Sequence, residues 1–372
     1  TGDHDKARAI FADVLKSSPA FTAAVRSLAA LELTSGQPDE AEAVYKSALS
    51  HQPENGAILL DYGYFLAQQQ RTDLAIQQFQ AASQIEDHKV DGNVALARAY
   101  IASNQPEQAK AALIVHQGID HSGVWAELGN AQMMSEEFAS ALKSYNRLAN
   151  LEPTSSTPHY LIATAYIALG EFKPAKQALK KSIEVDGQFV PALSTYVNLL
   201  IANDELEDAK AWLKKLEASA PKNTNLAIFA GDIAAKEKRY TAATHHYSGA
   251  YALDPSTGIR QRLVQALIKS EGATAAIEFL EKDVIDKPDN VHSRLLLANA
   301  YMNHNKIDAA IEAYRATLNI DGEQPVALNN LAWLLKDSAP EEALAYAERA
   351  HALKPENPDI KETLKQIQQT LK

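Results

Sequence analysis

The sequence predicts an all-α fold, in which pairs of antiparallel helices stack along one axis in a single elongated domain that covers residues 1–372. The main observation is an alanine that recurs at an almost constant interval. Seven of the ten intervals are 34 residues, and the other three are 32 or 33 residues. The chain is therefore a repeat array, and its marker alanines are Ala7, Ala41, Ala75, Ala109, Ala141, Ala175, Ala209, Ala243, Ala276, Ala310 and Ala343.

Three further patterns keep step with the marker alanine. An aromatic residue or a leucine follows ten of the eleven markers by four positions, with Ala347 as the exception. A Pro, Gly or Asp, each of which ends helices, follows ten markers by twelve positions. A small residue precedes the marker by eleven or twelve positions in eight of the ten full units. The small residue and the marker let two helix axes approach closely, and the large residue fills the gap toward the next pair.

The expected elements follow in chain order. Ala7 belongs to the second helix of a pair, so residues 1–21 are predicted to form a half repeat. Ten repeats occupy residues 22–357, with first helices beginning near residues 22, 56, 90, 122, 156, 190, 224, 258, 291 and 325. Residues 358–372 are predicted to form a capping helix, whose apolar face carries Ile360, Leu364, Ile367 and Leu371.

Both the N-terminus and one internal junction depart from this regularity. The half repeat lacks a first helix, so the chain looks cut from a longer protein, and the face around Ile10, Phe11 and Val14 is expected to pair two copies as a homodimer. Between His116 and Gly123 the unit shortens to 32 residues. Either this junction is a hinge or the second helix is simply shorter, and the pattern leaves both interpretations open.

The period and markers resemble the tetratricopeptide repeat. The fullest match is the unit with Trp125, Leu128, Gly129, Ala141, Tyr145 and Pro153, and the resemblance covers the whole chain. It implies a right-handed superhelix of helix pairs, in which the first helices form the inner, concave face. It also implies a scaffold, since this fold serves many unrelated systems.

Composition excludes several classes of function. The 36 basic and 47 acidic residues give a net charge of -11 without a basic block, which argues against binding of nucleic acid or anionic lipid. No apolar run is long enough for a membrane span. Cysteine is absent, which excludes disulfides and cysteine-ligated zinc and slightly favours an exported location.

Motifs of catalysis are also missing. The sequence has no Walker or dinucleotide loop, no Gly-x-Ser-x-Gly and no His-Glu-x-x-His. His245 and His246 are adjacent, but neighbours on a helix point about 100° apart and no third ligand follows at helical spacing. We therefore expect neither an enzyme, nor a metal site, nor a cofactor.

The remaining candidate for function is the inner face of the first helices. Its exposed positions lie about fifteen and eleven residues before each marker, on one stripe of the helix. The candidate binding residues on this stripe are Tyr64, Arg98, Asn130, Tyr160, Thr164, Asn198, Asp232, Arg262, Asn299, Asn329 and Trp333.

Three asparagines recur at one slot of this stripe: Asn130, Asn198 and Asn299. An amide both donates and accepts, so it can pair with the backbone of an extended peptide or with sugar hydroxyls. In members of the family that clamp a terminal carboxylate, a lysine stands one turn earlier. Here Ala126, Ser194 and Leu295 replace it, which argues against that use. The other interpretation is that these polar residues only keep an exposed helix face wet.

The sequence thus predicts a non-catalytic scaffold whose groove binds a protein segment. Residues 325–364 also resemble the last repeats of large bacterial tetratricopeptide lipoproteins, which accompany exopolysaccharide production and protein-sorting (PEP-CTERM) systems of Gram-negative envelopes. This resemblance implies a periplasmic location or an anchor at the outer membrane in the full-length protein. The alternative is a scaffold that binds an exported polysaccharide, with Tyr64, Tyr160 and Trp333 stacking on sugar rings.

Overall fold

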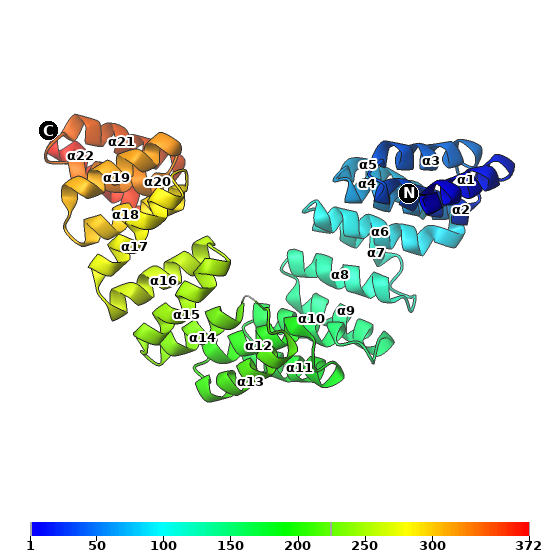
Figure 1. The fold of residues 1–372 in the computed structure, drawn as a ribbon, viewed down its shortest axis with the longest axis horizontal. Coiled ribbons are helices and arrows are strands. Elements are labelled where there is room, and N and C mark those ends of the chain that lie inside the picture. Colours follow the sequence, from blue (N-terminus) through cyan, green and yellow to red (C-terminus); the bar gives the residue numbers. More distant parts are fainter. Residues whose placement is uncertain (1, 224, 372) are drawn as a thin grey trace. The chain divides into compact units, whose positions relative to one another are not determined.

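The computed structural model describes residues 2–223 and 225–371. Over these residues the fold is all-α, with 22 α-helices, one 3₁₀ helix and no strand (Figure 1). This confirms the predicted fold class. Residue 224, near which one first helix was expected to begin, lies outside the described residues, and that helix is described from Asn225.

By packing, the chain divides into two compact units, Thr1–Leu199 and Leu200–Lys372, and the boundary falls within α12 (Val190–Ala202). That the chain forms one domain stays a prediction. The helices before α12 are α1 (Gly2–Ser17), α2 (Thr22–Thr34), α3 (Pro38–His51), α4 (Gly56–Gln68), α5 (Thr72–Ser83), the 3₁₀ helix η1 (Glu86–His88), α6 (Lys89–Ala102), α7 (Pro106–Ile114), α8 (Ser122–Met134), α9 (Phe138–Leu151), α10 (Thr157–Ala168) and α11 (Phe172–Val185).

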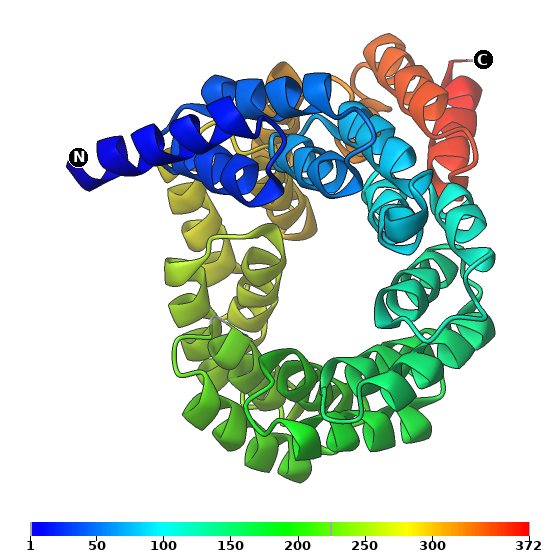
Figure 2. The same ribbon diagram turned by 90° about the vertical axis from the view of Figure 1, so that its right-hand side faces the viewer.

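The second unit continues the same alternation of first and second helices. After α12 come α13 (Leu206–Ser219), α14 (Asn225–Lys236), α15 (Tyr240–Leu253), α16 (Thr257–Ser270), α17 (Ala273–Asp286), α18 (Val291–Asn303), α19 (Ile307–Ile320), α20 (Pro325–Leu335), α21 (Pro340–Leu353) and α22 (Pro358–Thr370). Within each unit, an even-numbered first helix lies against the odd-numbered second helix that follows it (Figure 2).

Close approach of the two helices in a pair explains the recurring small residues. The ten markers from Ala41 to Ala343 are fully buried. At Gly63, Gly129 and Gly231, a Cβ atom would lie 2.3 to 2.5 Å from the ring of the large residue on the second helix, so only glycine fits. The small and large positions are thus two sides of one contact.

The turn inside each pair uses a left-handed residue, which lies five positions before most markers. Gly36 and Gly170 have φ of 75° and 76° at this position, and Gly272, four positions before its marker, has φ of 93°. In six other pairs a non-glycine residue takes φ between 57° and 60°: Gln70, Asn104, Glu136, Asp204, Lys238 and Asn305. These six residues adopt a conformation that costs an L-residue about 1–2 kcal/mol.

The irregular junction contains a short second helix. The helix α7 has only 9 residues, whereas the complete second helices elsewhere have 12 or 14. His116 is buried in the loop that follows, where its Nε2 lies 3.0 Å from Asn93 Nδ2. The structure therefore shows a shorter second helix, and a hinge at this position stays a prediction.

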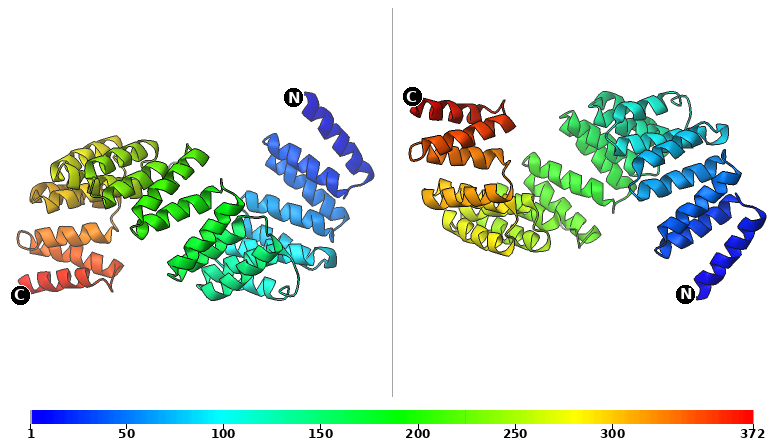
Figure 3. Two further views of the ribbon diagram at one scale, coloured as in Figure 1. Left: turned by 90° about the horizontal axis from the view of Figure 1, so that it is seen from below. Right: turned by 90° about the horizontal axis from the view of Figure 1, so that it is seen from above.

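The terminal helices are α1 and α22, which lie at the N- and C-terminal ends of their units (Figure 3). On α22, Ile360 and Ile367 are buried against the preceding pair, as expected for a cap. The expectation for Leu371 was wrong, because this residue follows the last helical residue and is exposed. On α1, Ile10 is 62% exposed.

Candidate protein-binding face

All the predicted binding residues lie on first helices. In the first unit they belong to α4, α6, α8, α10 and α12, and in the second unit to α14, α16, α18 and α20. The repeat places them at equivalent positions of successive first helices. We call the surface that they share within each unit the first-helix face.

One position of this face, eleven residues before the marker, carries a polar residue in several repeats, and we call it the polar slot. In three repeats a tyrosine of the second helix donates a hydrogen bond to the polar slot. Asn130 Oδ1 accepts a hydrogen bond of 3.0 Å from Tyr145 Oη. Asp232 Oδ1 accepts one of 2.6 Å from Tyr247 Oη. Asn299 Oδ1 accepts one of 2.5 Å from Tyr314 Oη. In each case the tyrosine lies 15 residues later, on the second helix of the same pair, so part of the polar capacity of these slots is used inside the protein.

Asn198 differs from the other two recurring asparagines because no tyrosine lies behind it. The residue four positions after its marker is Leu213 instead of tyrosine. Asn198 is exposed, and its amide makes no hydrogen bond to a residue that the structure describes. It is the recurring asparagine whose donors and acceptor are all available to a ligand.

Ion pairs link successive first helices along the face. In the first unit, Arg26 lies 2.8 Å from Asp61, and Arg98 lies 2.8 Å from Glu127. In the second unit, Arg262 lies 3.1 Å from Asp232. Because each arginine is largely exposed, these pairs contribute little to stability. They do hold the guanidinium groups in defined positions on the face.

Three aromatic residues of the predicted set line the face. Tyr64 is 44% exposed and packs edge-on against Phe79, at 5.1 Å between ring centroids. Partial burial raises the pKa of Tyr64, so the phenol stays neutral. Tyr160 is half-buried, and its ring packs edge-on against Phe189 at 5.8 Å.

Trp333 is 40% exposed, and the ammonium of Lys336 lies 3.7 Å from the centre of its ring system. The remaining predicted residues present less to solvent. Thr164 Oγ1 donates a 2.8 Å hydrogen bond to the carbonyl of Leu161. Asn329 Oδ1 is buried without a hydrogen-bond partner among the described residues.

A recess in the second unit lies on the first-helix face between α14 and α16, with α15 as its floor. Its volume is about 370 Å³. Sequence reasoning had placed only Arg262 and Ala266 there, and it missed the six other wall residues because they lie outside the two stripe positions. The wall consists of Ala235, Tyr240, Tyr247, Arg262, Gln265, Ala266, Ile268 and Lys269. Burial and the bond to Asp232 raise the pKa of Tyr247, which keeps its hydroxyl protonated as a donor.

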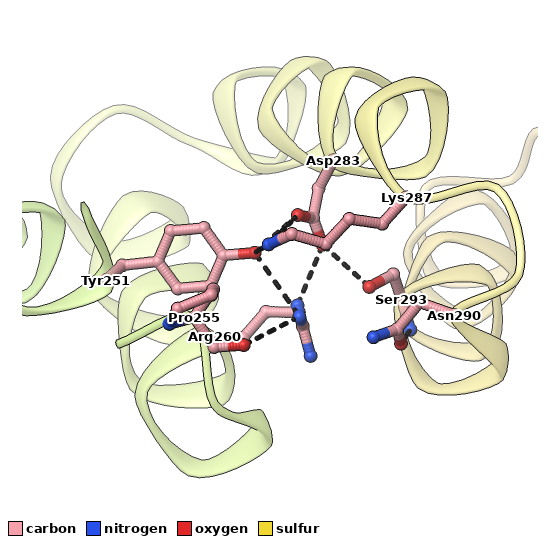
Figure 4. A network of polar contacts seen from close by, with 7 residues as sticks. All are labelled: Tyr251, Pro255, Arg260, Asp283, Lys287, Asn290 and Ser293. Atoms are coloured by element: carbon pink, nitrogen blue, oxygen red, sulfur yellow. Dashed lines mark hydrogen bonds and ion pairs between the residues drawn. The ribbon is translucent and has the colours of Figure 1, made fainter. Parts of the chain in front are cut away.

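A polar cluster is buried on other elements of the second unit (Figure 4). Asp283 of α17 lies 2.8 Å from the fully buried Arg260 of α16 and accepts hydrogen bonds from Ser293, Lys287 and Tyr251. Burial alone would raise the pKa of Asp283, but these hydrogen bonds and the charge of Arg260 lower it. The carboxylate is thus ionised and its hydrogen bonds are satisfied inside the protein, where it joins consecutive helices instead of facing a ligand.

Neither a metal centre nor a membrane helix emerges from the described part of the chain. Over residues 2–223 and 225–371, no three His, Asp or Glu side chains gather closely enough to hold a metal ion. The rings of His245 and His246 are 5.9 Å apart, and burial lowers the pKa of His246. Over the same residues, no helix combines the length and apolarity needed to cross a bilayer.

Known proteins share this repeat. Models described as tetratricopeptide repeat match residues 1–50, 26–87, 263–326 and 295–358, residues 66–128, and residues 157–189. A solved tetratricopeptide repeat protein from Parabacteroides merdae has 13% sequence identity, a TM-score of 0.50, and a match covering 75% of this chain and 98% of that chain. This likeness concerns the fold alone.

Two curated relatives are similar over longer stretches of sequence. Anaphase-promoting complex subunit 3 of Schizosaccharomyces pombe is 24% identical over 200 residues, which are 54% of this chain and 30% of that protein. DnaJ homolog subfamily C member 3 of Gallus gallus is 22% identical over 307 residues, which are 80% of this chain and 52% of that protein. The chain therefore spans about a third to a half of the length of these relatives.

Stacked helix pairs with a polar and aromatic first-helix face define a non-catalytic scaffold for protein–protein interaction. The repeats that match identify its family. The chain belongs to the tetratricopeptide repeat family.

Proposed function

We propose that the first-helix face binds an extended segment of a partner protein. The observation that carries this proposal is the free amide of Asn198, at a slot where the equivalent residues are held by tyrosines. A primary amide can bond both the N–H and the C=O of an extended backbone. In the same unit as Asn198, the exposed ring of Tyr64 supplies apolar contact area for side chains of such a ligand, and Trp333 supplies it for a ligand of the second unit.

The setting that we favour for this activity is a bacterial envelope. The support is the resemblance of residues 325–364 to the last repeats of bacterial lipoproteins from exopolysaccharide secretion and protein sorting. By its name, one curated relative is a subunit of a multiprotein complex, which fits a role in assembly without favouring this setting. The partner would then be another protein of the export machinery.

Selection of peptides from a random displayed library tests the proposal. Peptides that bind the first unit are expected to lose roughly tenfold in affinity on Asn198→Ala, and peptides that bind the second unit should lose as much on Trp333→Ala. A tenfold loss corresponds to about 1.4 kcal/mol. The matched control is Lys282→Ala, an exposed second-helix substitution, which should leave binding unchanged. Peptides that are insensitive to both first-helix changes, or that lose affinity on the control substitution, would contradict the proposal.

A polysaccharide ligand is the second candidate, favoured by the exposed rings of Tyr64 and Trp333. Such rings stack on sugars, and a free amide bonds hydroxyls. Titration of the protein with purified envelope polysaccharides separates the two candidates. If Trp333→Ala abolishes glycan binding while the selected peptides depend on neither Asn198 nor Trp333, the carbohydrate function replaces the peptide function.

Self-association through α1 is a further proposal about partners, supported by the exposure of Ile10. Burying such a side chain in a dimer contributes about 1.5–3 kcal/mol. Light scattering over a range of protein concentrations should show a dimer that Ile10→Glu disrupts. A monomer at every concentration would remove this proposal.

A further inference from the structure

The recess between α14 and α16 has an unusual charge for this protein. Two cations, Arg262 and Lys269, belong to its wall, and no acidic residue does. The chain as a whole has a net charge of -11. A concentration of positive charge on such a background attracts an anionic group.

The recess residues of α16 form one stripe of that helix. Arg262, Gln265, Ala266 and Lys269 follow the i, i+3, i+4, i+7 spacing that brings side chains to one face. At about 1.5 Å rise per residue, Arg262 and Lys269 are separated by roughly 10 Å along the axis. The two cations therefore flank the recess and do not converge on a single point.

The two cations differ in the ion pairs that they already form within the protein. Arg262 Nε donates to Asp232 Oδ1 at 3.1 Å, so the charge of Arg262 is partly compensated. Lys269 is exposed and forms no ion pair with any residue that the structure describes. Lys269 should therefore attract a carboxylate of a ligand more strongly than Arg262 does.

Between the cations the recess is apolar. Ala235 and Ala266 leave space between the two first helices, and the ring of Tyr240 and the half-exposed Ile268 complete the wall. The volume of about 370 Å³ is at the lower end of the roughly 300–1,000 Å³ found for small-ligand pockets. It is large enough for one bulky apolar side chain and the backbone that carries it.

We propose that this recess reads an acidic–apolar–acidic segment of the partner protein. A bulky apolar side chain enters between α14 and α16, one carboxylate of the segment pairs with Lys269, and a second carboxylate lies near Arg262. A segment in the polyproline II conformation has three residues per turn and advances about 3.1 Å per residue, so two carboxylates three residues apart lie on one side and match the spacing of the cations. This inference rests on the proposed binding of a protein segment by the first-helix face, and adds the chemistry of that segment.

Fluorescence anisotropy with a labelled peptide tests this inference. The probe is the acetylated and amidated peptide Gly-Glu-Ser-Phe-Glu-Gly, which has no terminal charge, and its counterpart has glutamine in place of both glutamates. The acidic peptide should bind at least fivefold more tightly than its counterpart. Lys269→Gln should remove most of that preference, whereas Lys282→Gln, an exposed lysine on α17, should not.

A charge exchange shows whether the contact is direct. Lys269→Glu should abolish binding of the acidic peptide. Of the two peptides that carry lysine in place of a single glutamate, one should regain affinity for that variant. Circular dichroism should show unchanged helicity in both Lys269 variants, since the side chain is exposed. Recovery of this kind supports a direct pair between Lys269 and the ligand.

The inference is overturned if the acidic and glutamine peptides bind equally, if neither binds at millimolar concentration, or if Lys269→Gln has no effect. None of these results removes the proposed function, because selected peptides would still depend on Asn198 or Trp333. Conversely, acidic preference at Lys269 together with selected peptides insensitive to Asn198 and Trp333 would retain the recess and overturn the wider first-helix face.

Discussion

Glu42 is held by more partners than most surface carboxylates. Arg71 donates hydrogen bonds of 2.6 and 3.1 Å to its two oxygens, Tyr62 Oη donates one of 2.7 Å, and the ammonium of Lys46 lies at 2.8 Å. The bond from Arg71, opposed by burial and helped by Lys46 and Tyr62, lowers the pKa of Glu42 to about 2. Glu42 lies on α3 and Arg71 is the residue that directly precedes α5, so this ion pair connects α3 to the start of the next second helix.

The stability of the first unit should therefore depend on pH through Glu42. Its pKa is lower in the folded state than the ordinary 4.5, so its stabilisation is complete above pH 4.5 and is lost as pH falls through 2. Glu42→Gln should lower stability by up to about 3 kcal/mol at pH 7. The difference from the wild type should shrink as the pH approaches 2, as measured by urea unfolding.

The exposed Glu54 supplies the control for this measurement, since it forms no ion pair with a described residue. Glu54→Gln should change the free energy of unfolding by less than about 0.5 kcal/mol at any pH. A gap between wild type and Glu42→Gln that stays constant from pH 7 to pH 2 would contradict the assignment.

Asp283 is the second residue with a sharp prediction. Asp283→Asn keeps the shape of the side chain but leaves the buried Arg260 without a counter-charge. Breaking a buried pair on one side costs about 3–5 kcal/mol, whereas replacing both partners by apolar residues is often neutral. We expect Asp283→Asn to lower the thermal midpoint strongly, Arg260→Met with Asp283→Leu to recover most of the loss, and the exposed Asp286→Asn to have little effect. An Asp283→Asn variant as stable as the wild type would contradict this role of Asp283.

The left-handed position in the turn gives a prediction for a structural element. Gln70 occupies it with φ 60°, and glycine adopts this conformation without the steric cost of a Cβ. Gln70→Gly should stabilise the protein by about 0.5–1 kcal/mol. Gln68→Gly, two residues earlier in α4, should destabilise it by up to about 1 kcal/mol. Denaturant unfolding of both variants checks the contrast, and equal signs would contradict the role of the turn.

The helix pairs could be predicted from the sequence because their contacts are local and periodic. Small residues such as the marker Ala141 and Gly129 must recur in each repeat for the two helix axes to approach, so the packing produces a regular spacing in the sequence. The left-handed turn left a weaker trace, since Gln70, Glu136 and Lys238 fill a position where glycine would have been recognised. There the hydrogen-bonded turn decides the conformation, and the residue tolerates it.

The candidate site was only partly predictable. Its stripe positions followed from the spacing, but the partners of each polar residue did not. The bond between Asn130 and Tyr145 could have been inferred from the sequence, because tyrosine stands four positions after the marker in each of the three units with a bonded slot. The recess could not, because its shape depends on which side chains of α14, α15 and α16 are short.

At the scale of the whole molecule, stability should be local. In a repeat array each pair contacts only its neighbours, so a substitution is felt over a few helices. Asp283→Asn should accelerate amide hydrogen exchange in α15 to α18 and leave α1 to α5 unchanged. Mass spectrometry of peptic fragments measures both regions in one experiment. Equal acceleration in both units would mean that the chain unfolds as a single cooperative body.

The tyrosines behind the polar slots mean that recognition can diverge without any change at the surface. Tyr145 is almost completely buried, and Tyr145→Phe would delete one interior oxygen atom while releasing the amide oxygen of Asn130 to the solvent side. Duplicated copies of such a unit can therefore acquire different ligands while their outward-facing residues stay identical. Comparing only exposed residues between two such proteins would miss the difference.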